Sequence, residues 1–337
     1  MTIRESALTI LLLSGCLVVV GCSAQTNTRT PVVVVFETEG EHGAGTISAY
    51  STASGSRCIV RQQGLFSTLL IGYDAASNTW LLDTSAWPDA ALGCVGKLHD
   101  GKMSTLRLAD FPQDAVVQDL ARTGGLMLSS VQGGFLILST YDLCGSLKSR
   151  RVLGMPHRTI TDCIGQVSVT RAGVVAASLL MGDTKRSELC IFDAQGHLKE
   201  RIGRGTDPLY APDGRHLAYN DYTVNRTDSL GAQTVEGNEG TIIIYDSVTR
   251  ARNEIAARTP PGKGWLGVLG GVVLDEYRWS PDGQRLVCSY VQGQYAEQSL
   301  YAVDVSGSAP KWEKLPVEVY AGRWTVMDKM PPAACKP

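Results

Sequence analysis

Tyr210-Ala-Pro-Asp-Gly-Arg-His-Leu-Ala-Tyr219 and Trp279-Ser-Pro-Asp-Gly-Gln-Arg-Leu-Val-Cys288 are two versions of one phrase. Each has an aromatic residue, a small residue, Pro-Asp-Gly, two polar residues and an apolar run. After an insertion, each is followed by a second strand-like run that ends in aspartate, Thr241–Asp246 in one copy and Ser299–Asp304 in the other. A supersecondary unit that recurs at a period of about forty residues or more indicates a repeat architecture, because one unit cannot bury its own apolar face.

The Asp-Gly pair of each phrase lies between two apolar runs and predicts a β-hairpin. A tight primed turn needs positive φ, which glycine adopts without a Cβ clash. The proline before it has no N–H and therefore ends the strand. Because the aromatic residue, the turn and the downstream strand recur in the same order, we interpret the two hairpins as repeats.

Two weaker copies lie upstream, at Leu120–Ser130 and Val169–Ser178, and they lack the Pro-Asp. A second strand pair follows each copy, Phe135–Thr140 with Leu147–Leu153 and Glu188–Asp193 with His197–Ile202. The turn glycines of the four copies are expected at positions 125, 173, 214 and 283.

Four short strands per unit, arranged as a meander, form a propeller blade. The pattern predicts an all-β, six-bladed β-propeller over residues 32–328, with seven blades as an alternative, and a disordered tail over 329–337. The predicted blades are Val32–Arg61, Leu65–Leu108, Ala115–Leu153, Ile164–Ile202, Leu209–Ile255 and Tyr277–Val317. The first blade lacks an inner strand, and we expect Val319–Val326 to supply it. This would close the ring and remove exposed sheet edges.

Tyr277-Arg-Trp-Ser-Pro-Asp-Gly-Gln-Arg-Leu-Val287 resembles the WD-repeat-like motif of TolB-type six-bladed propellers, which recurs in prolyl-oligopeptidase-type peptidases. The match is close in the two C-terminal blades and degenerate elsewhere. We expect it to cover the propeller alone. We expect neither the α/β domain of TolB, because the segment between Cys22 and Val32 is too short for it, nor a hydrolase domain after Lys329.

Residues 1–21 are predicted to be a lipoprotein signal peptide. Arg4 precedes an apolar run, Ala7–Gly21, and a short basic region before a short apolar core is typical of a secretion signal and too short for a membrane span. The run ends in Val19-Val-Gly-Cys22, which resembles a bacterial lipobox.

A second lipobox-like match is Leu13-Ser-Gly-Cys16. We prefer Cys22 as the lipidated residue, because cleavage there leaves residues 22–31 as a polar tether. A cleaved signal peptide with an incidental cysteine is the alternative. Lipidation would hold the propeller at a membrane of the bacterial cell envelope, outside the cytoplasm, since each buried CH₂ of an acyl chain contributes about 0.8 kcal/mol. The choice between inner and outer membrane stays open.

The formal net charge of −2 gives no electrostatic case for binding nucleic acid. Of nine cysteines, Cys16 and Cys22 belong to the processed N-terminus, so seven remain and at least one is unpaired. Cys190 and Cys288 lie in apolar runs and are expected in the core. An export compartment would permit a Cys144–Cys163 disulfide, although the blade pattern places these residues towards opposite ends of their strands.

Patterns for catalysis, cofactors and metals are weak. There is no G-x-S-x-G, P-loop, C-x-x-C or H-E-x-x-H, and we expect no cofactor or metal. Gly262–Gly267 matches G-x-G-x-x-G, but Pro260-Pro261 precedes it where a dinucleotide fold would place a strand. Asp213 and Asp282 are interpreted as turn residues, not as paired catalytic acids.

Three long connections are predicted to converge on one face of the propeller: Asp221–Glu239, Thr259–Gly271 and Gln292–Gln298. Loops on a rigid scaffold often carry binding residues, and aromatic and arginine side chains dominate binding surfaces. The candidate partner-binding residues are Asp221, Tyr222, Arg226, Trp265 and Tyr295. The alternative is that these loops are only solvated.

Three function classes follow. The first is a non-catalytic, membrane-tethered propeller that binds a protein or peptide of the cell envelope. The second is an envelope hydrolase or lyase that uses the channel or the long-loop face. The third is a structural or sensory subunit. The oligomeric state and the identity of the partner stay open.

Overall fold

The computed structural model describes residues 12–13, 16–17, 32–39, 45–55, 57–62, 69–74, 77, 79–83, 94–99, 102–111, 115–121, 125–226, 233–256, 272–292, 297–305, 310–320 and 324–327. The chain divides into two compact units, Met1–Thr30 and Pro31–Pro337. In the first unit, β1 (Leu12–Leu13) pairs antiparallel with β2 (Cys16–Leu17). Cys22 lies outside the described residues. Nowhere in the described ranges does a helix have both the length and the apolarity needed to cross a membrane.

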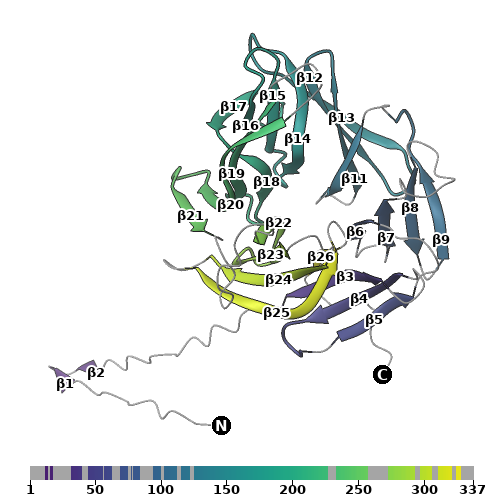
Figure 1. Cartoon of the computed structure of the whole chain (residues 1–337), viewed down its shortest axis with the longest axis vertical. Helices are drawn as coiled ribbons and strands as arrows, with labels where there is room; N and C mark the ends of the chain where they lie inside the picture. The colour runs from purple at the N-terminus through teal and green to yellow at the C-terminus, as the bar shows by residue number, and fades with distance from the viewer. Residues whose placement is uncertain are drawn as a thin grey trace. The chain divides into compact units, whose positions relative to one another are not determined.

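The second unit consists of six four-stranded antiparallel sheets, each a meander, and forms a six-bladed β-propeller (Figure 1). Listed from the inner strand outward, the first blade consists of β26 (Trp324–Met327), β3 (Val33–Glu39), β4 (Gly45–Ser51) and β5 (Arg57–Gln62), and the second of β6 (Leu69–Asp74), β7 (Thr79–Asp83), β8 (Cys94–His99) and β9 (Lys102–Arg107). The third consists of β10 (Val116–Ala121), β11 (Gly125–Gln132), β12 (Phe135–Tyr141) and β13 (Leu147–Leu153), and the fourth of β14 (Ile160–Val169), β15 (Val175–Met181), β16 (Ser187–Phe192) and β17 (Leu198–Gly203). The fifth consists of β18 (Thr206–Tyr210), β19 (His216–Arg226), β20 (Gln233–Asp246) and β21 (Arg252–Ala256), and the sixth of β22 (Val272–Trp279), β23 (Arg285–Gln292), β24 (Glu297–Asp304) and β25 (Lys311–Tyr320).

The inner strands contact one another in the order β26, β6, β10, β14, β18, β22 and back to β26, so the sheets form a closed ring. The predicted fold is therefore confirmed with six blades. Closure comes from β26, which pairs with β3 from Trp324↔Phe36 to Met327↔Val33. The predicted closing segment began too early, since Val319 belongs to β25 of the sixth blade.

The aromatic residue that opens each repeated phrase packs against the preceding blade. Tyr210 lies among residues of the fourth blade, and its N–H donates to Ser168 Oγ at 2.8 Å. Trp279 lies among residues of the fifth blade, and its indole N–H donates to the Leu209 carbonyl at 2.9 Å. The phrase thus both forms a hairpin and joins two blades.

The turn of the phrase differs from the predicted primed turn. Gly214 N donates to Ala211 O, and Ala211 N donates to His216 O, so the loop has four residues and begins with an ordinary Pro-Asp turn. Only Gly214 has positive φ, at 70°, and Gly283 repeats this in the sixth blade. The carboxylate of Asp213 accepts the Arg215 N–H at 2.8 Å, which confirms its structural role.

Gly173 occupies the same turn position in the fourth blade, with φ 82°. Gly125 does not, because it lies in β11, opposite Ala121. An added Cβ there would collide with the Tyr141 carbonyl, so close backbone approach, not turn geometry, requires this glycine.

Three inner strands begin earlier than predicted, at Ile160, Thr206 and Val272. In each, a β-bulge or other irregularity interrupts the ladder, between Ile164 and Ser168 in β14, between Thr206 and Leu209 in β18 and between Leu274 and Tyr277 in β22. A bulge adds residues to one strand only, so the alternation of side chains fails there.

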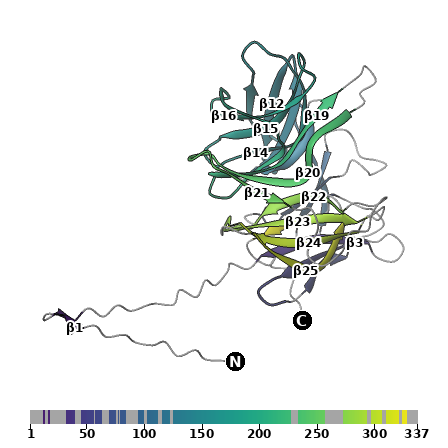
Figure 2. The same ribbon diagram turned by 60° about the vertical axis from the view of Figure 1, so that its left-hand side comes forward.

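The insertion after Asn220, which was predicted as a loop, is also strand. After a bulge, pairing of β19 with β20 resumes at Tyr222↔Gly237 and continues to Arg226↔Gln233. Figure 2 shows β19 and β20 running together as a long green hairpin. We call its outer part, residues 222–226 and 233–237, the arm.

Cys190 and Cys288 are fully buried free thiols in the core, as predicted. Cys144 and Cys163 are also free, so the disulfide considered between them does not form. Burial raises the pKa of the Cys163 thiol to about 12, which keeps it protonated at neutral pH.

Candidate functional site

Three of the five predicted partner-binding residues lie together on β19, at the base and along the arm: Asp221, Tyr222 and Arg226. Trp265 and Tyr295 lie outside the described residues. The predicted loop face is therefore described only where the arm leaves the fifth blade.

Asp221 fixes the base of the arm. Its side chain is 14% exposed and accepts two hydrogen bonds from Arg204, Nε to Oδ1 at 2.7 Å and Nη2 to Oδ2 at 2.6 Å. The carboxylate raises the pKa of the Arg204 guanidinium. Arg204 lies in the connection between β17 and β18, so this pair ties the hairpin to the junction of the fourth and fifth blades.

Tyr222 points to the inner strand of its own blade. Its hydroxyl donates to Asp207 Oδ2 at 3.2 Å, and Asn220 Nδ2 lies 3.3 Å from the same oxygen. Asp207 adopts a left-handed φ of 52° on β18, and its Oδ1 faces Gly165 in the bulge of β14. The Asp207 carbonyl accepts a hydrogen bond from the Tyr277 hydroxyl. Asp207 therefore links the inner strands of three blades.

Arg226 docks the tip of the arm onto the fourth blade. Its Nη2 donates to Asp162 Oδ2 at 2.9 Å, and its backbone N–H donates to the Lys185 carbonyl at 2.9 Å. A second ion pair joins Arg186 Nη2 to Glu236 Oε2 at 2.7 Å. The arm is thus held in place by a neighbouring blade.

A cleft of about 630 Å³ lies beneath the arm, between the fourth and fifth blades. We call it the arm cleft; its lining residues are Thr184, Arg186, Ser187, Glu188, Arg201, Gly203, Arg204, Thr223 and Glu236. Glu188 accepts from Arg158 Nη1 at 2.7 Å and from Arg201 Nε at 3.0 Å. Burial raises the pKa of Glu188, but the two guanidinium groups outweigh it, and the net effect lowers that pKa. Charged side chains of both signs therefore line the cleft, three arginines and two glutamates.

The outer edge of β20 in the arm is open. Val224 N donates to Ser187 Oγ, so this N–H points away from β20. Opposite residues of an antiparallel ladder either exchange both hydrogen bonds or exchange none. Since Val224 faces Val235, the N–H and C=O of Val235 must point away from β19. The N–H of Arg226 also points away from β20, because it donates to the Lys185 carbonyl. The N–H and C=O of Gln233, which lies opposite Arg226, therefore point away from β19 as well.

The strand that covers this edge in the body of the blade does not reach the arm. β21 pairs with β20 only from Thr241 to Tyr245. In the described part of the chain, no backbone partner occupies the outward groups of residues 233–237. The side chain of Val235 on this edge is 44% exposed.

Sequence reasoning missed the residues that hold the arm, above all Arg204, Asp207 and Glu236. They belong to no motif, and they meet only in the folded ring. One local signal was available, because Tyr222, Thr223 and Val224 are strand-forming residues inside a segment that otherwise suggests a loop.

No protein family model matches the chain, and no curated protein sequence matches it. Among solved structures, it is similar to the periplasmic gluconolactonase PpgL of Pseudomonas aeruginosa, at 13% identity and a TM-score of 0.46, over 88% of this chain and 98% of that one. It is also similar to a protein of unknown function from Bacteroides caccae, at 11% identity and a TM-score of 0.49, over 86% and 94% of the two chains. A third is a chain of a nidogen/laminin complex, at 11% identity and a TM-score of 0.48, over 90% and 100%. Structures this distant do not indicate an activity or a ligand for this chain, and the resemblance to TolB-type propellers stays a prediction.

Proposed function

We propose that this protein is a binding propeller that recruits a protein or peptide partner through the arm. The observation that carries the proposal is the open edge of β20, where consecutive outward backbone groups lie on a strand that is itself fixed in place. An extended peptide adds to such an edge as a further strand, with main-chain hydrogen bonds giving affinity and neighbouring side chains giving specificity.

Two features support a partner at this edge. The arm is docked by Arg226 and Arg186, so little ordering of the arm is required on binding. A strand added to β20 would also run beside Glu236, which lines the arm cleft. The ion pairs of the cleft, Arg186 with Glu236 and Arg201 with Glu188, can exchange partners with a peptide that carries both signs of charge, which favours a protein ligand over a simple anion.

The place of action is proposed from the sequence. We infer that Cys22 is acylated and that residues 22–31 tether the propeller at a membrane of the bacterial cell envelope. Mass spectrometry of the mature N-terminus tests this anchor, and an unmodified terminus or one that starts at Cys16 would contradict it.

The test of the partner site is Val235→Pro. Proline removes the outward N–H of Val235 but leaves the hydrogen bonds between β19 and β20 unchanged, and edge strands tolerate proline. We expect a loss of partner capture of about fivefold to a hundredfold, since an unpaired acceptor on the bound strand costs about 1–3 kcal/mol. The measurement is recovery of the partner from detergent-solubilised envelopes, with a photo-crosslinking residue at position 234, which is exposed on the same strand.

Val235→Thr is the matched control, because it keeps the N–H and a β-branched side chain. It should capture the partner about as well as the native chain. Equal capture by Val235→Pro and the native chain would overturn binding by strand addition. A crosslink from position 234 to a second copy of this chain would show self-association instead.

A further inference from the structure

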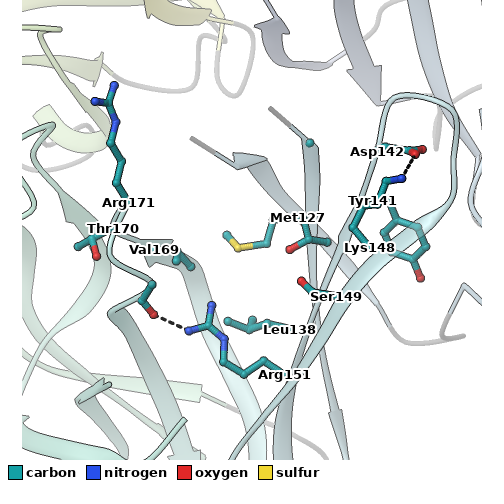
Figure 3. A pocket seen from close by; sticks show the side chains of 13 residues that line it. Met127, Leu138, Tyr141, Asp142, Lys148, Ser149, Arg151, Val169, Thr170 and Arg171 are labelled. Atoms are coloured by element: carbon teal, nitrogen blue, oxygen red, sulfur yellow. Dashed lines mark hydrogen bonds and ion pairs between the residues drawn. The ribbon is translucent and has the colours of Figure 1, made fainter. Parts of the chain in front are cut away.

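A second cavity lies on the opposite face of the ring, between the third and fourth blades (Figure 3). Its volume is about 420 Å³, and small-molecule sites typically occupy about 300–1,000 Å³. Its walls come from β11, β12 and β13 on one side and from the turn after β14 on the other. The arm belongs to the other face, so this cavity is independent of the proposed partner site.

The cavity has an apolar floor and a polar rim. Met127, Leu138 and Val169 form the floor, and the exposed Ser149 lies at the rim (Figure 3). This combination suits a ligand that has an apolar body and one polar end.

The charges around the cavity are mainly positive. Lys148, Arg151 and Arg171 line it together with one carboxylate, Asp142, so the four side chains carry a net charge of +2. Lys148 Nζ and Asp142 Oδ2 form an ion pair at 2.8 Å. The excess positive charge therefore comes from the two arginines.

Arg151 is the important one, because its hydrogen bonds use only one of its three nitrogens. Nη1 donates to the carbonyls of Gly173 and Ala194, as Figure 3 shows for Gly173. Within the described residues, Nε and Nη2 have no acceptor and Arg151 has no ion-pair partner. Partial burial lowers the pKa of the guanidinium, although the charge of Asp193 acts in the opposite direction. A guanidinium that has lost hydration is ready to accept an anion.

In other arginines of this protein, the edge of the guanidinium formed by Nε and Nη2 binds a carboxylate. It does so in the pairs Arg158–Asp183, Arg201–Glu188, Arg204–Asp221 and Arg215–Asp246. Planar carboxylates fit this fork through two parallel hydrogen bonds. Arg151 lines a cavity, and no carboxylate among the described residues occupies its Nε and Nη2 edge.

We propose that this cavity binds a small organic acid. The carboxylate of the ligand occupies the Nε and Nη2 edge of Arg151, and its apolar body rests on Met127, Leu138 and Val169. Arg171 adds positive potential at the rim. The proposal needs no covalent chemistry.

The test uses isothermal titration calorimetry and amide NMR shifts of the full propeller, with hexanoate, acetate, hexanamide and inorganic phosphate as probes. We expect hexanoate to bind about tenfold or more tightly than acetate, because only hexanoate covers the apolar floor. Hexanamide should bind at least about tenfold more weakly than hexanoate, since it lacks the charge. Equal affinity for hexanoate and acetate, or for hexanoate and phosphate, would reduce the site to an unspecific anion contact and overturn the proposal.

Arg151→Gln should weaken hexanoate binding by about tenfold or more, and Arg151→Lys, which keeps the charge but loses the fork, by less. The matched control is Arg150→Gln, on the same strand with its side chain bound to Gln132 Oε1, and it should change the affinity by less than about twofold. If Arg151→Gln loses the fold, Ser149→Tyr, at an exposed rim position, fills the cavity and leaves Arg151 in place. Unchanged hexanoate binding in Ser149→Tyr, or equal losses in Arg150→Gln and Arg151→Gln, would contradict this location.

Discussion

In three blades, an aspartate at the end of the third strand accepts hydrogen bonds from the turn that follows. These residues are Asp142, Asp193 and Asp246. Each carboxylate accepts two backbone N–H groups of the turn that follows, for example those of Cys144 and Ser146 at 2.9 Å. Bonds of this kind satisfy donors that the turn would otherwise leave to water. The turns after Asp142 and Asp193 close at Ser146 and His197, whereas the turn after Asp246 is one residue longer and closes at Ala251. One residue type therefore satisfies the turn amides in turns of different length.

The acid response of Asp142 follows from its contacts. Lys148, and then the turn N–H groups, lower the pKa of this carboxyl from 3.8 to about 2. A carboxyl with a lowered pKa stabilises the fold above its unfolded pKa, and that contribution is lost as the pH falls through the folded value, here between about pH 4 and 2. Lys148→Met should raise the pKa of Asp142, while the remaining N–H donors keep it below 3.8.

Carboxyl ¹³C shifts measured across this pH range give the value directly. Lys185→Met removes a lysine on another blade and should leave the titration of Asp142 unchanged. An unaltered pKa in Lys148→Met would mean that the turn amides alone set it.

At the scale of elements, the bulges of the inner strands join the blades. In β14, Gly165 to Val167 lie opposite one residue of β15, and the backbone of Gly165 approaches the carboxylate of Asp207 on β18. Gln118 of the third blade accepts the Val167 N–H at 2.7 Å. One bulge therefore contacts both neighbouring blades.

Gly165→Ala tests this junction. The φ of 67° alone should cost an alanine about 1–2 kcal/mol, and its Cβ would also collide with Asp207 Oδ1, so the total loss of unfolding free energy should be larger. Gly203→Ala is the control, since Gly203 has a φ of 92° but nothing within 4 Å of an added Cβ. Urea denaturation compares the two. Equal losses would show that Asp207 moves aside at no cost.

How much of the structure could be predicted from the sequence depends on how far apart in the chain the interacting residues lie. The blades around Tyr210 and Trp279 were predictable, because an aromatic residue, a turn and an alternating strand are local signals. The bulge at Gly165 was not, because added residues break the alternation on which strand prediction depends. Neither was the environment of Arg151, whose acceptors, Gly173 and Ala194, belong to the next blade.

At the scale of the whole molecule, the ring depends on four residues from its C-terminal side. Trp324 of β26 is 1% exposed and packs with Phe36 and Val34 of β3 and with Val319 of the sixth blade. Loss of a buried tryptophan side chain costs about 3–5 kcal/mol, and loss of β26 would also open the inner edge of β3.

A chain truncated after Tyr320 should therefore unfold at a lower temperature and aggregate at concentrations where the native chain does not. A chain truncated after Asp328, which keeps β26, is the control and should melt like the native protein. Calorimetry and light scattering measure both effects. If the two truncated chains behave alike, β26 does not hold the ring closed.

The pairing of Trp324 with Phe36 also affects the order and the rate of folding. Synthesis, and the export proposed for this chain, both deliver the N-terminus first, so β3 must wait for its partner until almost the whole propeller has followed. During that interval the first blade exists as three strands. A contact between residues so far apart in the chain raises the contact order and slows the final folding step. The risk of aggregation through the unpaired edge of β3 is therefore greatest in the interval before β26 arrives.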